Sequence, residues 1–477
     1  MQPEGNPTAF ADATALAEAI RHRRTTATAV MQASLDRAKS DPFGALCHLD
    51  EEMGLEAASA FDRLAADKSS QARNAPFAGL PFLAKDLSNA ARGLPVHAGS
   101  PALASRVPVA EQDSVIFERF RQAGLLPFGV TTTPEFGLAL TSEPAGGPIA
   151  RNPWNPEFSS GGSSGGAASA VASGIVALAH ASDAAGSIRV PAACCGLVGL
   201  KPSRGLTSNA PNFGNHLMGI TGELVLARSV RDIRTALVAI SGNTMGPYGE
   251  LTLSGIPVRR LRIGLVDTAP GGIGPEQAEA IRSSAALLDS QGHTIVDVNV
   301  DALDALAQEA AMLIRTILSV SLASMLDEMK IADAEISAIA AAIADEGRQL
   351  TAASLFAADV RAARLAHGCW QMFEQVDAIA MPMLAHSAPK VGAMPMDHGN
   401  ADAHWDHMTA IAPRTPLANI GGLPALSLPR GFDQSGMPLA LQLIGPIGSD
   451  LLLLDIAHQM EAADPWTFPA SIAGADR

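Results

Sequence analysis

The chain reads RLRIGLV at residues 260–266, PEQAEAIRSSAALLDS at 275–290 and TIVDVNV at 294–300. The first and last of these segments are short apolar runs typical of strands, and the middle segment has the length of a helix. A strand, a helix and a second strand in succession are typical of α/β proteins. We therefore predict an α/β fold.

The same patterns extend in both directions from this unit. We predict a loop over the Pro-, Gly-, Asn- and Ser-rich residues 141–162 and one large domain over residues 1–477. Within this domain, residues 1–70 are expected to form an N-terminal helical segment, and the Ala-rich residues 301–372 a helical lobe packed on the sheet. Further strands are predicted at 78–84, 125–130, 175–182, 197–201, 377–381 and 425–428, and further helices at 8–40, 50–67, 114–123, 164–174 and 451–461.

Composition narrows the class of protein. The 477 residues are 47% hydrophobic, and 33 Lys and Arg stand against 48 Asp and Glu, which gives a net charge of −15. This acidity disfavours a nucleic-acid partner, because binding phosphates requires basic patches. The start of the chain lacks the basic and apolar parts of a signal peptide, and no apolar run has the length of a membrane span. Cys47, Cys194, Cys195 and Cys369 show no metal-ligand spacing, so we expect a reduced, cytoplasmic protein without a membrane partner.

Two serines lie among unusually small residues. Ser163 lies in GGSSGG (161–166), and Ser187 lies in SDAAGSIR (182–189). Glycine and alanine let the backbone turn tightly, expose a hydroxyl and leave neighbouring N–H groups free to face a substrate oxygen. Both serines are therefore candidates for nucleophilic catalysis.

Lys85 is a candidate base for such a serine. It lies in GLPFLAKD (79–86), whose apolar run without alternation favours burial on both faces, with an ordinary surface lysine as the alternative. Burial disfavours the ammonium form, and a neutral amine can take a proton from a serine hydroxyl. His180 is a second candidate base, although a core histidine is the more common outcome for such a residue.

The segment 161–166 has other interpretations. A flexible linker would not be followed at once by an apolar helix, and a phosphate-binding loop would need Lys and Ser or Thr where Ala167 and Ala168 stand. GGSSG (161–165) also matches the G-x-S-x-G nucleophile elbow, although the Pro-rich segment before it does not fit the strand that the elbow requires. An α/β-hydrolase-type esterase using Ser163 and a histidine is therefore an alternative.

A cluster of acidic residues and histidines near the C-terminus has the composition of a metal site but no metal-binding spacing. We therefore predict no metal site and a polar surface loop over residues 393–412. The residues of the cluster are Asp397, His398, Asp402, His404, Asp406 and His407.

Taken together, these segments resemble the amidase signature family of serine hydrolases. The resemblance runs over most of the chain and implies the family's fold, a single large domain with a central mixed β-sheet covered by helices on both faces. The matching segments are, in the family's order, GLPFLAKD (79–86), GGSSGG (161–166), GSIRVPA (186–192), CGLVGLKP (195–202), NIGGLPA (419–425) and residues 436–445, from GMP to QLIG.

The resemblance implies a catalytic triad. Ser187 is the expected nucleophile, Ser163 the serine that relays its proton and follows a cis peptide bond, and Lys85 the base. No cofactor is implied. The expected oxyanion hole consists of the backbone N–H groups of Ala184, Ala185, Gly186 and Ser187, and the expected supporting residues are Ser164, Asp183 and Arg189.

Three departures from the family pattern bear on local structure and specificity. Ala185 stands where the family commonly has a glycine, and this variant resembles the branch that includes 6-aminohexanoate-cyclic-dimer hydrolase. Residues 129–132, GVTT, replace a usual Gly-Lys-Thr-Asn segment and lack its lysine and asparagine. Gly137 falls where relatives line the acyl pocket, which predicts a roomy pocket.

We therefore expect an amidohydrolase that cleaves a non-peptide C–N bond through a Ser187 acyl-enzyme. The expected small-molecule substrate is a linear, cyclic or aryl amide or a carbamate, and a homodimer is compatible with the family. A tRNA-dependent amidotransferase subunit is the alternative from the same family, against which the acidic charge and residues 129–132 argue. A non-catalytic interaction protein is a third interpretation, against which the complete triad argues. Specificity is expected to come from residues 140–158, 205–220, 301–372 and 393–412.

Overall fold

The predicted strand–helix–strand unit forms one end of the central sheet. β7 (Arg262–Leu265) and β8 (Thr294–Asp297) pair in parallel, and α10 (Pro275–Ser290) connects them. Pro275 lies in the first turn of α10, where its missing N–H leaves no helical hydrogen bond unmade. The structure is a computed structural model that describes residues 12–67, 71–87, 89–208, 217–244, 249–255 and 260–475.

The central sheet has eight strands in the order β4-β6-β5-β10-β11-β9-β7-β8. β7 is parallel to both of its neighbours, whereas the other pairs are antiparallel, so the sheet is mixed as predicted. The remaining strands of the sheet are β4 (Leu178–Asp183), β5 (Val198–Lys201), β6 (Gly222–Ala227), β9 (Ala378–Pro382), β10 (Ala425–Phe432) and β11 (Pro438–Ile444).

A second sheet of three strands carries the candidate lysine. Its order is β1-β3-β2, with β1 (Leu46–Leu49) antiparallel and β2 (Leu80–Lys85) parallel to β3 (Leu125–Thr131). Every residue of β2 is buried, as the apolar run without alternation predicted. β2 also packs beside β4 of the central sheet, which brings Lys85 to the end of β4.

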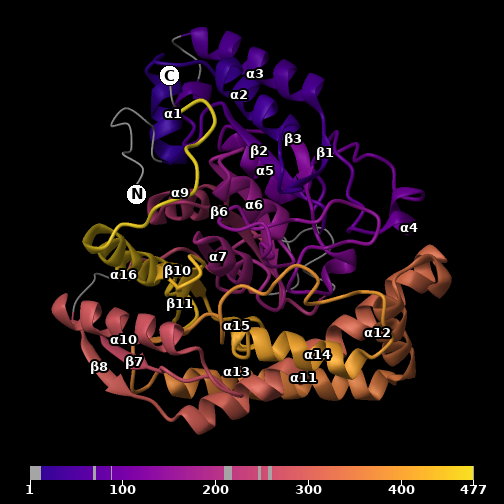
Figure 1. Ribbon diagram of the computed structural model, residues 1–477, viewed down its shortest axis with the longest axis vertical. Coiled ribbons are helices and arrows are strands. Elements are labelled where there is room, and N and C mark those ends of the chain that lie inside the picture. The colour runs from indigo at the N-terminus through magenta and orange to yellow at the C-terminus, as the bar shows by residue number, and fades with distance from the viewer. Residues whose placement is uncertain are drawn as a thin grey trace.

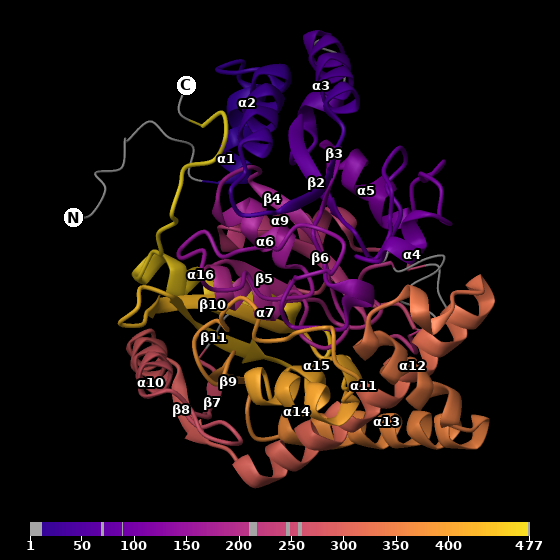
Figure 2. The same cartoon turned by 45° about the vertical axis from the view of Figure 1, so that its right-hand side comes forward.

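Helices cover both faces of the central sheet (Figures 1 and 2). α6 (Gly165–Ala172) and α7 (Arg189–Cys195) pack on one face, and α9 (Val230–Ile240), α10 and α16 (Asp450–Ala463) pack on the other. α6 has no side chain larger than valine, and a Cβ at Gly166 would lie 2.4 Å from the backbone nitrogen of Thr132. The small residues of α6 thus allow close packing against both sheets.

The N-terminal helices lie beside the three-stranded sheet (Figure 1). Of the residues predicted to be helical at 8–40, residues 8–11 lie outside the described part of the chain, and the rest form two helices, because the chain turns at Arg23, where φ is +58°. A side chain caps the N-terminus of each helix in this region. The helices and their caps are α1 (Ala13–Arg21) with Asp12, α2 (Ala27–Lys39) with Thr26, and α3 (Glu51–Ala66) with Asp50.

Residues 301–372 are largely helical, as predicted. α11 (Val300–Met329), α12 (Ala338–Gln349) and α13 (Ala352–Met372) pack together. Among the described residues, α11 is the one helix long and apolar enough, by length and composition, to cross a membrane. Its most apolar part is 44% buried inside the molecule, and α11 also packs against α15 (Thr415–Ile420), so its apolar side chains are used in the core.

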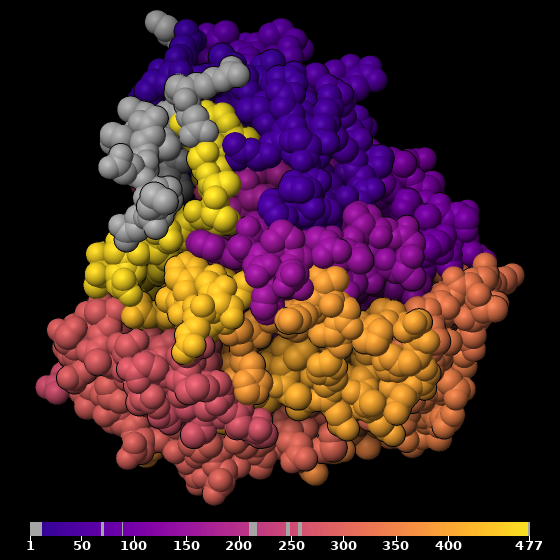
Figure 3. Space-filling view, viewed as in Figure 1, coloured from indigo at the N-terminus to yellow at the C-terminus, as the bar shows by residue number. Residues whose placement is uncertain are grey.

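The prediction of a surface loop over residues 393–412 was wrong in its second half, which forms α14 (Ala401–Ile411). Figure 3 shows the orange surface around residue 400 facing the viewer, so one side of α14 lies on the surface. Its other side is buried at the spacing of one helical face. The buried residues are Ala401, His404, Trp405 and Met408.

Candidate active site

Lys85 ends β2 and is fully buried. Its Nζ lies 2.8 Å from Oγ of Ser163, 2.9 Å from Oγ of Ser182 and 3.4 Å from the carbonyl oxygen of Ser182. Burial disfavours the ammonium form and lowers the pKa of Lys85 to about 7, although the carboxylates of Glu223 and Asp183 oppose this shift. A large share of Lys85 is therefore neutral at pH 7 and able to accept a proton.

Ser163 follows a cis peptide bond from Gly162, as the resemblance implied, and only 2% of its surface is exposed. Its carbonyl oxygen accepts hydrogen bonds from the hydroxyls of Thr133 at 2.8 Å and Ser142 at 3.2 Å, which hold the turn in place. Within the described residues 132–164, no strand leads into this turn. The strand–turn–helix of a nucleophile elbow is therefore not formed at Ser163, and the group bound to its hydroxyl is a lysine rather than a histidine.

Ser187 lies in the turn between β4 and α7 and lines the same pocket as Ser163. The backbone N–H groups of Ala184, Ala185 and Ser187 donate no hydrogen bond to any residue that the structure describes. Three of the four donors expected for an oxyanion hole are thus free to bind a substrate oxygen.

The fourth expected donor, Gly186, requires a correction. Its N–H donates to Oδ1 of Asp183 at 2.7 Å and is therefore not free for a substrate. Gly186 has a φ of +130°, and a Cβ there would lie 2.9 Å from Oγ1 of Thr415. The glycine is needed for the shape of the turn rather than as an oxyanion donor.

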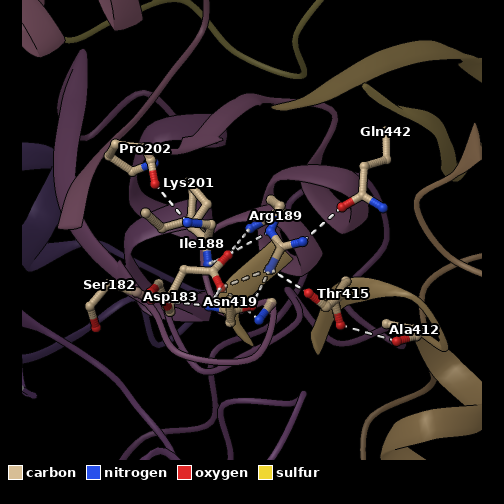
Figure 4. Close-up of polar contacts among 12 residues, drawn as sticks. Ser182, Asp183, Ile188, Arg189, Lys201, Pro202, Ala412, Thr415, Asn419 and Gln442 are labelled. Atoms are coloured by element: carbon tan, nitrogen blue, oxygen red, sulfur yellow. Dashed lines mark hydrogen bonds and ion pairs between the residues drawn. The ribbon is translucent and has the colours of Figure 1, made fainter. Parts of the chain in front are cut away.

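Asp183 and Arg189 meet at the end of β4, where neither side chain is exposed. Burial alone would raise the pKa of Asp183, but the Arg189 guanidinium and hydrogen bonds from Arg189 and Asn419 hold it well below its usual range. The ionised carboxylate also accepts the N–H of Ile188 at 3.2 Å, which fixes the turn before α7. The other partners of the guanidinium are Gln442, Asn419 and the carbonyl oxygen of Thr415 (Figure 4).

Ser164 connects the two serine-containing turns. Its N–H donates to the carbonyl oxygen of Ser187 at 3.3 Å, and its hydroxyl donates to the carbonyl oxygen of Ser182 at 3.3 Å. These contacts fix the position of one turn relative to the other.

The pocket at the serines has a volume of about 40 Å³ and largely apolar walls. Gly137 lines it, but the expectation of a roomy pocket was wrong, because a Cβ at Gly137 would lie 2.6 Å from Cδ2 of Leu87. Leu87 fills the space that the glycine leaves. The other apolar side chains of the wall are Phe136, Leu138, Leu217, Leu318, Trp405 and Met408, and Ala184 and Ala185 complete it.

The His- and Asp-rich cluster lies on and before α14, the helix whose Trp405 and Met408 line the pocket. In the described part of the chain, no group of three His, Cys, Asp or Glu side chains is arranged to hold a metal ion. Nε2–H of His404 donates to the carbonyl oxygen of Leu138 at 2.7 Å and so ties α14 to the pocket. His398 lies beside it, with ring centroids 5.7 Å apart.

Sequence reasoning missed Ser182 and most of the pocket wall. Ser182 precedes Asp183 and is two residues after His180, so it shares a face of β4 with a residue already under consideration. The i, i+3, i+4, i+7 spacing of the buried residues of α14 was a second available signal.

Comparison with known proteins identifies the family. The amidase family model matches residues 29–454. The chain is 31% identical to 6-aminohexanoate-cyclic-dimer hydrolase of Pseudomonas sp. (strain NK87) and 33% identical to putative amidase AmiC of Mycobacterium tuberculosis (strain ATCC 25618 / H37Rv), each over 95% of both chains. The solved structure of 6-aminohexanoate cyclic dimer hydrolase complexed with substrate is 29% identical, with a TM-score of 0.88 over 98% of this chain and 99% of that chain.

The chain belongs to the amidase signature family. It is an amidase, a hydrolase that cleaves carbon–nitrogen bonds other than peptide bonds.

Proposed function

We propose that Ser187 is the nucleophile of this amidase, Ser163 its proton relay and Lys85 its base. The observation that supports this assignment most strongly is the 2.8 Å contact between Nζ of Lys85 and Oγ of Ser163. Ser163 and Ser187 line the same pocket. A lysine with a pKa of about 7 can act as a base at neutral pH without a histidine.

Acylation begins when neutral Lys85 takes the proton of Ser163. Ser163 in turn takes the proton of Ser187 as Oγ of Ser187 bonds to the amide carbon. The carbonyl electron pair moves to the oxygen, and the N–H groups of Ala184, Ala185 and Ser187 stabilise the resulting oxyanion. Loss of one such donor typically costs about 3–4 kcal/mol of barrier. The oxyanion collapses, the C–N bond breaks, and the proton returns from Lys85 through Ser163 to the departing amine.

Deacylation repeats the same relay with water as the nucleophile. Ser163 and Lys85 accept the proton of the water as its oxygen attacks the acyl carbon, and the proton returns to Ser187 as the acid leaves. Oγ and the carbonyl oxygen of Ser182 accept hydrogen bonds from the two N–H groups of neutral Lys85, which directs the lone pair of Nζ at Ser163. Side chains supply every proton transfer, so the mechanism uses no cofactor.

The substrate that fits this pocket is an amide with an uncharged acyl group. Seven larger apolar side chains form most of the wall, and placing a charge against them without a partner would be costly. The relatives named for 6-aminohexanoate cyclic dimer support a linear or cyclic amide, and the solved structures include an aryl acylamidase of the same fold. We therefore propose a linear, cyclic or aryl amide, with carbamates as a secondary class.

We also propose that the enzyme works in the cytoplasm as a homodimer. The four cysteines are unpaired, which suits a reducing compartment. The molar mass of the purified chain in solution, measured by light scattering against the 49.1 kDa of one chain, tests the dimer.

The catalytic assignment is tested with a fluorophosphonate probe and peptide mapping. The label is expected on Ser187, and Lys85→Ala is expected to abolish turnover at neutral pH. Labelling that persists in Ser187→Ala and disappears in Ser163→Ala would support the esterase alternative instead. Hydrolysis of anilides, aliphatic amides, cyclic amides and carbamates by the isolated chain would exclude dependence on amidotransferase partners and rank the substrate classes.

A further inference from the structure

A buried pair, His180 and Glu223, lies next to Lys85 and is not used in the mechanism above. His180 and Ser182 are two residues apart on β4, and Glu223 of β6 lies opposite Ser182 in the antiparallel register. Residues two apart on a strand, and residues directly opposite on its neighbour, share a face of the sheet. His180, Ser182 and Glu223 therefore lie on one face, and the first two both contact Lys85.

The hydrogen bonds define the protonation of His180. The backbone N–H of Lys85 donates to Nδ1 at 3.3 Å, so Nδ1 carries no proton. Nε2 therefore carries the proton and donates it to Oε2 of Glu223 at 2.9 Å. The imidazole is therefore neutral, and Oε2 of Glu223 accepts its hydrogen bond. The rings of Phe117 and Phe120 on α5 (Val115–Gln122) pack against His180 and keep water from it.

The Glu223 carboxylate is incompletely paired inside the protein. Its side chain has no exposed surface, and Oε1 has no hydrogen-bond partner among the described residues. No arginine or lysine of the described chain forms an ion pair with it, whereas Asp183 is neutralised by Arg189. A buried negative charge of this kind is costly unless a positive charge forms nearby.

Lys85 supplies that positive charge when it accepts the proton. Burial penalises its ammonium form, and Glu223 is the larger of the two carboxylate influences that oppose the penalty. The charge of Glu223 is thus complementary to the species formed during catalysis, in which Lys85 is protonated.

We propose that Glu223, held by neutral His180, is a positioning residue of the reaction: it sets the pH at which Lys85 becomes a base and stabilises the ammonium formed when Ser163 gives up its proton. This inference rests on the proposed triad. It assigns a role in proton transfer to a pair of residues that touch neither the substrate nor the two serines.

Other titratable groups near these strands must be separated from Glu223 in a test. Asp232 on α9 is the main one, because burial and the charge of Asp12 raise its pKa to about 7, close to that of Lys85. Its carboxylate binds the N–H groups at the start of α1 and not the lysine. The other charged groups on or next to the elements packed against these strands are Asp12, Glu18, Arg21, Asp36, Arg37, Lys39, Asp86, Glu118, Arg119, Arg121, Asp183, Lys201, Arg228, Arg231 and Arg234.

The test is the pH dependence of kcat/KM and of fluorophosphonate labelling in Glu223→Gln. Glutamine keeps an acceptor for Nε2–H and removes only the charge. Without this charge the ammonium of Lys85 is less favoured, so the acidic limb of both profiles is expected to move to lower pH by about one unit. The rate on the plateau is expected to fall by about three- to tenfold, because the protonated base is no longer stabilised.

Two further variants complete the experiment. Asp232→Asn removes the other nearby carboxyl that titrates near pH 7 and is expected to leave the limb in place. His180→Asn keeps an acceptor for the N–H of Lys85 but loses the donor to Glu223, so the limb is expected to move in the same direction as in Glu223→Gln. An unmoved limb in both Glu223→Gln and His180→Asn, with normal labelling of Ser187, would overturn the role of Glu223 and leave the triad intact. Absence of label on wild-type Ser187 would overturn the triad itself.

Discussion

Arg189 meets Asp183 through two parallel hydrogen bonds, Nε to Oδ2 at 2.9 Å and Nη2 to Oδ1 at 3.0 Å, inside the protein. The same carboxylate accepts the N–H of Gly186, so the ion pair holds the turn that presents Ser187. The position of Ser187, the proposed nucleophile, therefore depends on the two parallel donors of a planar guanidinium.

Arg189→Lys is expected to impair this turn while keeping the charge. An ammonium cannot make both hydrogen bonds to Asp183 and also reach Gln442 and Asn419, so kcat/KM should fall by about a hundredfold and the folded state should lose stability. Kinetics are measured well below the melting temperature of the variant, so that only folded enzyme contributes. Arg361→Lys, at an exposed ion pair with Glu309, is the control and should change neither property. Equal effects of the two substitutions would contradict this role of Arg189.

Gly186→Ala is expected to reduce labelling of Ser187 by about a hundredfold or more, a loss comparable to removal of an oxyanion donor. The reason is twofold: φ is +130°, and the new Cβ would lie 2.9 Å from Oγ1 of Thr415. Gly242→Ala is a matched control, because Gly242 has the same φ of +130° but its new Cβ would have no described atom within 4 Å. Normal labelling in Gly186→Ala, or an equal loss in Gly242→Ala, would show that the contact with Thr415 does not position Ser187.

The burial of Lys85 and the α/β class could be predicted from the sequence, because both depend on patterns within short continuous segments. Burial of β2 follows from apolar residues without alternation, and the β7–α10–β8 unit follows from a change of period. Motif resemblance supplied the pairing of Ser163 with Lys85, which no spacing within one segment reveals. Glu223 was missed for the opposite reason: a charged residue at the start of β6 argues against a buried strand until its partner on β4 is known.

The pocket wall was largely beyond sequence reasoning. Leu87, Leu217, Leu318 and Trp405 come from four distant segments and meet only in the folded chain. Gly137 lines the pocket, yet its effect on pocket size depends on Leu87, which lies 50 residues earlier in the sequence.

Leu87→Ala is expected to widen the pocket and change selectivity. Its side chain occupies the space beside Gly137, so its removal should raise kcat/KM for hexanoyl anilide relative to acetanilide by about tenfold, the scale of a few methylene contacts. The ratio of the two kcat/KM values is the measurement, since it cancels any loss of active enzyme. Leu64→Ala, at a side chain that is 58% exposed on α3, is the control. An unchanged ratio in Leu87→Ala would mean that another residue limits the acyl group.

Lys201→Met is expected to flatten the rise of stability with pH. Lys201 is buried in β5, and burial, reinforced by repulsion from Arg189, lowers its pKa from 10.5 to about 7. Between pH 7 and 10.5 the unfolded chain therefore binds a proton at this residue that the folded chain does not. Raising the pH removes that proton from the unfolded chain, so the free energy of unfolding increases with pH in this window. Lys85 has the same shift and keeps part of the slope in the variant.

The measurement is the free energy of unfolding by urea at pH 7 and pH 9. Methionine preserves the apolar stem and never binds the proton, so the variant should gain stability at pH 7 and less of it at pH 9. Lys390→Met, at an exposed position, is the control and should reproduce the slope of the wild type. If the free energy of unfolding of Lys201→Met has the same slope against pH as that of the wild type, the proton uptake on unfolding occurs at another group. A lysine that keeps its ammonium in the folded state contributes nothing to the difference in bound protons between the folded and unfolded chains.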